Sequence, residues 1–327
     1  METQLVLTYH DELVTRRQKL EQVLSQAPSN ENLNYLLREV DAALEKMDQG
    51  TYGLCEVCHD PIEPERLAID PLIRNCLDHL TAFEQRALER DLDLAFQIQQ
   101  GLLPRNSIQY DGWHAAYHYE PAGAVSGDYC DIILPEDSSR SLLFNVGDVM
   151  GKGVAASILM AHLHAMFRSL MITDMPLTEL VSRANRIFSE GTPSSHFATL
   201  VSGRADSHGE IEFCNAGHPY PLIIRADGVH EIASSALPIG VFCHSEFPSS
   251  FVHADRGDTL VLYTDGLTET MNASGEQYGE ERLMALLSGL RNASPQGIIE
   301  SCIRELKTFK GEIPKKDDVT IFVLHRD

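Results

Sequence analysis

The sequence predicts an α+β fold in its C-terminal two-thirds, preceded by a small helical module and a helical linker. From Tyr110 onward, short apolar runs are separated by Gly, Pro, Asp and Ser, which is typical of strands. These runs come in groups rather than alternating strictly with helices, which favours antiparallel sheets. Before Tyr110, apolar residues recur every three or four positions, the spacing of amphipathic helices. We therefore expect three parts, residues 1–80, 81–104 and 105–327.

Composition and charge limit what kind of protein this is. With 327 residues, 43% of them hydrophobic, the chain is long enough to bury a substantial core. Its formal net charge of −22 argues against unspecific binding to nucleic acid or an anionic membrane, because phosphate groups would be repelled. No apolar run approaches the ~20 residues of a membrane helix, and the N-terminus lacks the basic start of a secretory signal. Seven cysteines, three of them clustered, fit a reducing compartment, so we expect a cytoplasmic protein.

The first part begins with two helical patterns that predict a short antiparallel hairpin. Residues 10–27 carry apolar side chains at helical spacing, and a second pattern runs from Leu33 to Met47. Ser29 or Asn30 could cap the second helix. Neither helix has enough apolar residues to be stable alone, so another element must hold this region.

Four candidate metal ligands follow the hairpin. Two residues separate Cys55 from Cys58, and the same spacing recurs between Cys76 and His79. Three thiolates and one imidazole form a closed tetrahedral set for a structural zinc ion, with no position left for catalysis. The alternative is four buried or idle residues that fall at this spacing by chance. This interpretation is less favoured, because the same spacing occurs twice. His59 is a conceivable substitute for His79.

The stretch from Gly50 to Cys76 resembles the zinc finger of the DksA/TraR type, and the preceding hairpin fits that family as well. Those proteins insert a coiled coil into the secondary channel of RNA polymerase and do not read DNA. Here the hairpin is short and His79 replaces the fourth cysteine. The resemblance therefore implies one structural Zn²⁺, held by Cys55, Cys58, Cys76 and His79, and leaves a contact with RNA polymerase open.

A third helical pattern connects the finger to the remainder of the chain. Apolar residues recur from Leu77 to Leu102 in steps of three or four, interleaved with charged residues, and Pro104 ends the pattern. One interpretation is a helix that packs on its own domain. The other is a coiled-coil linker that forms a homodimer and carries a signal between domains. The pattern is too short to choose between them.

The third part contains the elements of the expected α+β domain. We expect strands at residues 113–119, 129–134, 141–147, 197–204, 210–215, 220–225, 249–253, 258–264 and 319–325. We expect helices at residues 154–172, 176–190, 279–290 and 294–309.

Several acids occupy matching positions at turns or at the ends of these strands. Asp128 and Asp148 lie beside glycines, Asp265 follows a strongly apolar strand, and Asp317 and Asp318 precede the last strand. Oxygen ligands from several strands suit a hard divalent cation such as Mg²⁺ or Mn²⁺. Two such ions that share a carboxylate polarise a water molecule for attack on phosphorus. Aspartate beside glycine also marks ordinary turns, so only the whole set predicts a metal site.

Residues from about 92 to the end resemble the SpoIIE/RsbU branch of the metal-dependent, type 2C-like protein serine/threonine phosphatases. The stretches that carry the resemblance follow the order of that family and are residues 95–104, 126–131, 147–154, 215–221, 237–241, 263–269 and 317–320. The resemblance implies an α-β-β-α sandwich with two Mn²⁺ or Mg²⁺ ions. In it Asp148 bridges both ions, the backbone carbonyl of Val149 adds a ligand, Asp265 and Asp317 complete the two ions, and Asp128 binds directly or through water.

The same resemblance implies dephosphorylation of phosphoserine or phosphothreonine in a regulatory protein, such as an anti-sigma-factor antagonist of a partner-switching pathway. No covalent phosphoenzyme is expected. We therefore predict a protein phosphatase regulated by its zinc module. The alternative from another class is a non-catalytic regulator, in which the module binds RNA polymerase or another partner and the phosphatase fold is a scaffold.

Four further residues near these motifs have two interpretations each. Cys130 could sense oxidation, although a buried apolar thiol is favoured. Met150 occupies the place where eukaryotic type 2C enzymes keep a histidine proton donor. Lys152 could neutralise phosphate or be a solvated turn residue, and His218 is expected to be structural rather than catalytic.

Overall fold

The chain divides into two compact units, Met1–Asp91 and Leu92–Asp327. This computed structural model describes residues 3–25, 30–135, 141–171, 173, 175–193 and 195–327. The boundary between the units falls inside helix α4 (Ala82–Leu102), in the region expected to be the linker. Over the described residues, no helix combines the length and apolar character needed to cross a membrane.

The first unit is built on the predicted helical hairpin. Helices α1 (Thr3–Leu24) and α2 (Glu31–Asp48) pack against each other. Asn30 caps α2, because its side chain accepts a hydrogen bond from the backbone N–H of Leu33 at 3.2 Å; Ser29, the other expected cap, lies outside the described residues. The buried face of the hairpin is continuous with Cys55 and Leu67, so the finger completes the core that the helices lack. The finger adds the short helices α3 (Pro64–Ile69) and η1 (Leu77–His79).

The second unit contains two antiparallel sheets. One sheet has, in spatial order, the strands β1 (Ser107–Tyr110), β2 (Trp113–Glu120), β11 (Val319–Arg326), β10 (Thr259–Tyr263), β7 (Leu222–Arg225) and β8 (Gly228–Glu231). The other has β3 (Asp128–Ile133), β4 (Leu142–Val149), β5 (Ala198–Ala205), β6 (Glu210–Ala216) and β9 (Ser249–His253).

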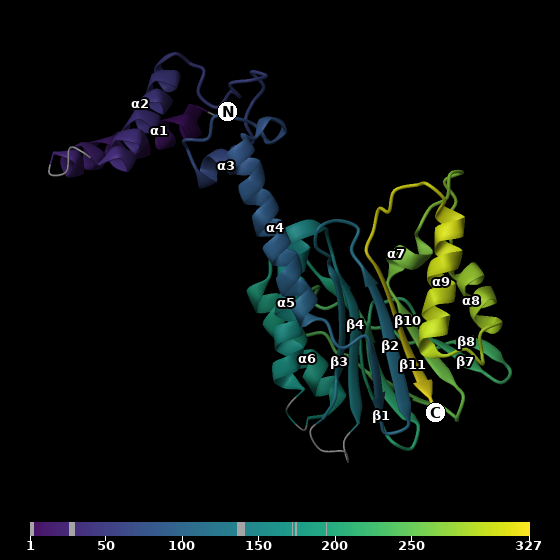
Figure 1. Cartoon of the computed structure of the whole chain (residues 1–327). Coiled ribbons are helices and arrows are strands. Elements are labelled where there is room, and N and C mark those ends of the chain that lie inside the picture. The colour runs from purple at the N-terminus through teal and green to yellow at the C-terminus, as the bar shows by residue number, and fades with distance from the viewer. Residues whose placement is uncertain (1–2, 26–29, 136–140, 172, 174, 194) are drawn as a thin grey trace. The chain divides into compact units, whose positions relative to one another are not determined.

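Three apolar cores stack these elements into layers. Between the sheets, side chains of both meet, and the rings of Phe144 on β4 and Phe322 on β11 stack with centroids 5.4 Å apart. Helices α5 (Gly153–Leu170) and α6 (Leu177–Gly191) cover the five-stranded sheet through a second core. Helices α8 (Glu280–Ser288) and α9 (Pro295–Lys310) cover the six-stranded sheet through a third (Figure 1). The α-β-β-α sandwich predicted from the sequence is confirmed.

The expected strands and helices of this unit are all present, with ends shifted by a few residues. Strands β1 and β8 and the single-turn helix α7 (Asp265–Thr268) were not expected. Strand β8 escaped notice because its side chains are partly or fully exposed, so it lacks an apolar run. The expected helix at 154–172 is described to Leu170, and residue 172 lies outside the described residues.

Candidate functional site

Two of the predicted acids face each other across neighbouring strands of the five-stranded sheet. Asp128 opens β3 and pairs in register with Asp148, near the end of β4. The strands approach closely here: a Cβ on Gly147 would lie 2.5 Å from the carbonyl oxygen of Thr199 on β5, so only glycine fits before Asp148. The backbone N–H of Val149 donates to the carbonyl oxygen of Gly127 at 3.2 Å, which closes this edge of the sheet.

The other acids lie at the ends of two neighbouring strands of the six-stranded sheet. Asp265 follows the end of β10 and Asp317 precedes β11, and these strands are antiparallel neighbours, so both acids lie at one edge. A Cβ on Gly266 would lie 1.9 Å from the carbonyl oxygen of Asp318, which shows how tightly the two segments pack. The sequence placed these acids at strand ends, and the structure brings the ends of both sheets together.

Asp128 connects the two sheets at this end through hydrogen bonds. Its carboxylate is buried and accepts hydrogen bonds from the hydroxyl groups of Thr264 at 3.0 Å and Thr320 at 2.5 Å, both from the opposite sheet. Burial and the neighbouring Asp148 carboxyl raise the pKa of Asp128 well above its usual value. Sequence reasoning missed both threonines, although each lies within three residues of a predicted acid.

The acids at this site oppose one another electrostatically. Burial, followed by the charges of Asp265 and Asp317, raises the pKa of Asp148 to about 7. Burial and neighbouring acids raise the pKa of Asp265 as well. Oxygen donors that repel one another in a partly buried site are the donor set that a hard divalent cation requires. The residues present therefore fit Mg²⁺ or Mn²⁺.

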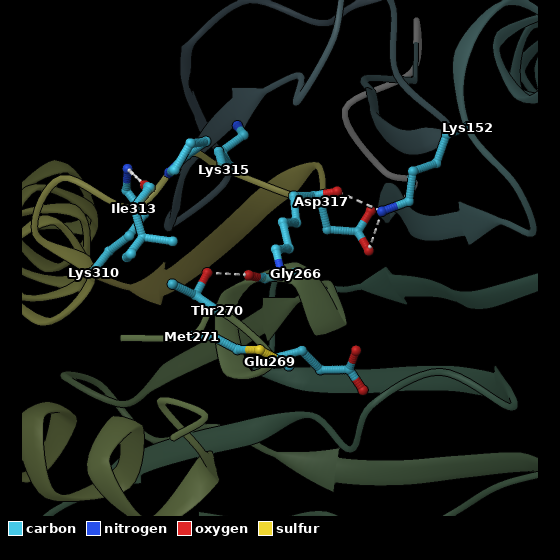
Figure 2. Close-up of a pocket in the computed structure, with 11 residues that line it drawn as sticks. Lys152, Gly266, Glu269, Thr270, Met271, Lys310, Ile313, Lys315 and Asp317 are labelled. Carbon is cyan, nitrogen blue, oxygen red and sulfur yellow. Dashed lines mark hydrogen bonds and ion pairs between the residues drawn. The ribbon is translucent and has the colours of Figure 1, made fainter. Parts of the chain in front are cut away.

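The neighbouring aspartates Asp317 and Asp318 have different surroundings. Asp318 is buried, and its two carboxylate oxygens accept hydrogen bonds from the backbone N–H groups of Ala122 at 2.6 Å and Gly127 at 2.8 Å. It thereby fixes the loop that leads into Asp128. Asp317 is half-exposed and pairs with Lys152, whose ammonium group lies 2.9 Å from its carboxylate (Figure 2). Asp317 is the one with oxygens available to a cation.

His218 lies behind Asp148, which the sequence alone did not place. Its ring Nδ1 is 2.9 Å from the hydroxyl of Thr199, and that hydroxyl is 3.5 Å from the backbone carbonyl oxygen of Asp148. Burial lowers the pKa of His218 to about 3, so the ring is neutral and structural, in line with the expectation from sequence. Cys130 lies in the core between the sheets, where burial raises the pKa of its thiol, so a redox role is not favoured.

Gln99 connects α4 to the loop before Asp128. Its side chain is buried, its amide nitrogen donates to the carbonyl oxygen of Ser126 at 2.8 Å, and its carbonyl oxygen accepts from the N–H of Ser126 at 2.9 Å. The sequence places this residue in a helical pattern and in the stretch 95–104 that carries the family resemblance, but gives it no role of its own. A polar residue on an amphipathic helix gave no signal that it would be buried.

The cysteine set in the first unit has the geometry of a tetrahedral site. Ligand atoms of Cys55, Cys58, Cys76 and His79 all lie within 4.8 Å of one another. The sulfur atoms of Cys58 and Cys76 are 3.7 Å apart, close to the ~3.8 Å that two 2.3 Å Zn–S bonds at a tetrahedral angle give. Burial acts to raise the pKa of Cys55, but backbone hydrogen bonds outweigh it and lower that pKa to about 6. At Cys58 a backbone hydrogen bond at Asp60 acts to lower the pKa, but burial and the neighbours Cys55 and Cys76 raise it to about 11, so the geometry of the cluster carries the assignment.

His59, the alternative ligand, is not part of that group. The carboxylates of the second unit do not form an equally compact group within the described residues.

The chain is similar to known proteins over its second unit. The family model of stage II sporulation protein E matches residues 138–327. The protein IcfG of Synechocystis sp. is 27% identical over 72% of this chain, but that match spans only 42% of IcfG. The phosphoserine phosphatase RsbU of Bacillus subtilis is 24% identical over 74% of this chain and 72% of RsbU.

A solved structure agrees on the fold. The PP2C domain of SiaA from Pseudomonas aeruginosa superposes with a TM-score of 0.64, at 20% identity, over 76% of this chain and 100% of that domain. Since the family model covers more than half of the chain, this protein belongs to the SpoIIE family of PP2C-type phosphatase domains.

Proposed function

We propose that this protein is a metal-dependent phosphatase that removes phosphate from phosphoserine or phosphothreonine in a regulatory protein. The observation that carries the proposal is the meeting of Asp148, Asp265 and Asp317 at the strand ends of two sheets, where burial, and after it the charges of Asp265 and Asp317, raise the pKa of Asp148 to about 7. Without cations the negative charges of these carboxylates repel one another. Divalent cations would remove this repulsion, so the site favours the metal binding that a metal-dependent hydrolase needs. Membership of the SpoIIE family supports the same activity.

The proposed ligands follow from the exposure of the acids. Asp148 would contact both ions, Asp265 and Asp317 would each contact one, and the backbone carbonyl of Val149 would add an oxygen. Asp128 would contact an ion directly through Oδ1 or act through water, because both threonine hydroxyls donate to its Oδ2 and leave Oδ1 to face the site. When bound, the two ions supply an activated water and neutralise phosphate charge.

The protein's own residues hold this arrangement in place. Thr264 and Thr320 fix Asp128, and Asp318 fixes the loop that precedes it. Lys152 lies at the rim of the site, where its ammonium group is positioned to attract a phosphoryl oxygen once Asp317 turns toward a cation. Met150 beside it has no ionisable group, so proton donation to the leaving group would fall to water.

We also propose that the first unit binds one structural Zn²⁺ through Cys55, Cys58, Cys76 and His79 and regulates the phosphatase through α4. Gln99 supports this route, because α4 directly holds Ser126, two residues before Asp128. A displacement of α4 would therefore move the loop at Ser126, which precedes the site residue Asp128. We further propose residues 1–80, 81–104 and 105–327 as finger, linker and catalytic domain.

The names of relatives support the substrate class. RsbU, a curated relative, is called a phosphoserine phosphatase, and we propose the same class here, with a partner-switching protein of the anti-sigma-factor-antagonist type as substrate. The contact with RNA polymerase and the homodimer through the linker helix stay predictions of the sequence.

Hydrolysis of a phenyl phosphate ester with Mn²⁺ tests the activity. The full chain should turn over the ester, and Asp148→Asn should lower turnover by about a hundredfold or more while the fold is kept, because removal of a ligand shared by both ions loses the activated water. Full activity of Asp148→Asn would refute the assignment.

Regulation by the zinc unit is tested with Cys76→Ser, which removes one ligand. Its turnover of the ester should differ from that of the wild-type protein, and Cys243→Ser, a change of cysteine outside the zinc set, serves as the matched control. Equal turnover of all three proteins would contradict regulation by the first unit but leave the phosphatase activity untouched.

A further inference from the structure

A pocket of about 220 Å³ opens beside Asp317 and the turn at Gly266, and lysines form much of its wall (Figure 2). Its charged lining residues are Lys152, Lys310, Lys315, Lys316, Glu269 and Asp317. Four positive and two negative side chains give this wall a net charge of +2, in a chain whose formal charge is −22. Positive charge is therefore concentrated next to the proposed reaction site.

Two of these lysines already have acidic partners. Lys152 pairs with Asp317 at 2.9 Å, and the ammonium group of Lys315 lies 3.4 Å from the carboxylate of Glu120. Lys310 and Lys316 make no ion pair with any described residue; Lys310 donates only to the backbone carbonyl oxygen of Ile313 at 2.5 Å. Their charges are uncompensated within the described chain, so they are free to meet an anion.

We propose that this lysine pocket binds an acidic side chain that flanks the phosphoserine of the substrate. The proposal rests on the phosphatase function and adds a rule for substrate choice. Asp317 belongs both to the pocket wall and to the proposed cation site, so the pocket adjoins the place where the phosphoserine would bind. An extended peptide advances about 3.3–3.6 Å per residue, which places an acid within a few positions of the phosphoserine over the lysines.

The chemistry of the wall favours a carboxylate over a nucleotide. Lysine ammonium groups act as mobile point charges that suit a flexible acidic side chain. The pocket has no aromatic residue in its wall on which a base could stack. Lys310 ends α9 and Lys316 lies in the segment that leads from α9 to β11, so one stretch of chain brings both lysines to the pocket wall.

The test uses the full-length, zinc- and manganese-loaded protein and two phosphoserine peptides. The peptides differ only in flanking residues, Glu in one and Gln in the other, and the readout is the ratio of their kcat/KM values. We expect the wild-type protein to prefer the acidic peptide, and Lys310→Gln and Lys316→Gln each to lower the ratio by about twofold to fivefold, the range of an exposed ion pair. The preference should shrink in high salt.

The matched control is Lys307→Gln, an exposed lysine on α9 outside the lysine pocket, which should keep the wild-type ratio. Lys310→Glu should shift preference toward a peptide with Lys flanks, which a loss of folding could not produce. A wild-type ratio of one, or a ratio unchanged by both lysine substitutions, would overturn the proposal. If the wild-type protein also fails to hydrolyse a phenyl phosphate ester, the phosphatase assignment itself is wrong and the proposal falls with it.

Discussion

Asp317 and Asp318 are neighbours in sequence but have different surroundings in the structure. We predict that Asp318 stabilises the fold and that Asp317 binds a cation, and substitution of each residue tests this. Asp318 is buried and accepts two backbone hydrogen bonds, from Ala122 and Gly127. The side chain of Asp317 is 42% exposed; one of its oxygens pairs with Lys152 and the other accepts from the N–H of Asp318. We predict that Asp318→Asn lowers the stability of the second unit, although this variant keeps all the proposed cation ligands. Asp317→Asn should leave stability almost unchanged and remove a cation ligand.

The magnitudes follow from the bonds that each change breaks. Asparagine keeps one carbonyl oxygen, so Asp318→Asn leaves one of two N–H donors unsatisfied, at a cost of about 1–3 kcal/mol. Asp318→Ala leaves both donors unsatisfied and should cost about 2–6 kcal/mol. Asp317→Asn breaks an exposed ion pair, which is worth about 0–1 kcal/mol, and it also relieves repulsion among the site acids.

Urea unfolding followed by tryptophan fluorescence measures the effect in the right unit. The chain has one tryptophan, Trp113, which lies buried in β2 of the second unit, so its fluorescence reports that unit alone. Turnover of a phenyl phosphate ester is measured on the same samples. If Asp318→Asn is as stable as the wild-type protein, or if Asp317→Asn loses more than about 1 kcal/mol, the division of tasks is wrong.

Three further predictions concern other parts of the molecule. Gly266→Ala should destabilise the second unit by about 1–3 kcal/mol, because the added Cβ would lie 1.9 Å from a backbone oxygen; an unchanged urea midpoint would contradict the close packing. Removal of zinc by a chelator should reduce helical circular dichroism through unfolding of the first unit while Trp113 fluorescence stays constant, and an unchanged spectrum would refute the ligand set. Burial lowers the folded-state pKa of His218 to about 3. As pH decreases from 6.5, the unfolded chain therefore binds a proton at this residue before the folded chain does, and the free energy of unfolding decreases. His218→Gln should therefore flatten the dependence of unfolding free energy on pH by about 1.4 kcal/mol per pH unit between pH 6 and 4; parallel curves would refute it.

The parts of this molecule that local sequence determines could be predicted. Strand β10 is buried throughout and β11 is buried except at His325, and each contains a run of four apolar residues, 260–263 and 321–324. The cluster of four candidate zinc ligands could be predicted, because the paired spacing of Cys55 with Cys58 and of Cys76 with His79 is the spacing of a short turn that brings two side chains together. The positions of the acids also followed from local pattern, since each adjoins a strand end.

The parts that depend on contacts between distant segments could not be predicted. Local pattern alone does not separate Asp317 from its neighbour Asp318, and only the family resemblance names Asp317, because the difference comes from backbone N–H groups almost two hundred residues away. Thr264, which follows β10, and Thr320 on β11 contact Asp128, which belongs to the other sheet, and nothing in their local sequence indicates this partner. Gln99 is hidden for the same reason, since its partner is a loop backbone.

The fold gathers like charges and supplies their structural support from uncharged groups. Asp128 is held by threonine hydroxyls, and Asp318 by backbone N–H groups, so neither depends on a basic residue. Lys152 is the cation that the described chain pairs with Asp317, and this pair is exposed, so a divalent ion can displace it at little cost. Basic residues built firmly into the site would have stabilised the acids and blocked the ions. By leaving the acids short of positive charge and placing lysines at the rim instead, the chain keeps affinity for cations at the centre and for acidic substrate at the edge.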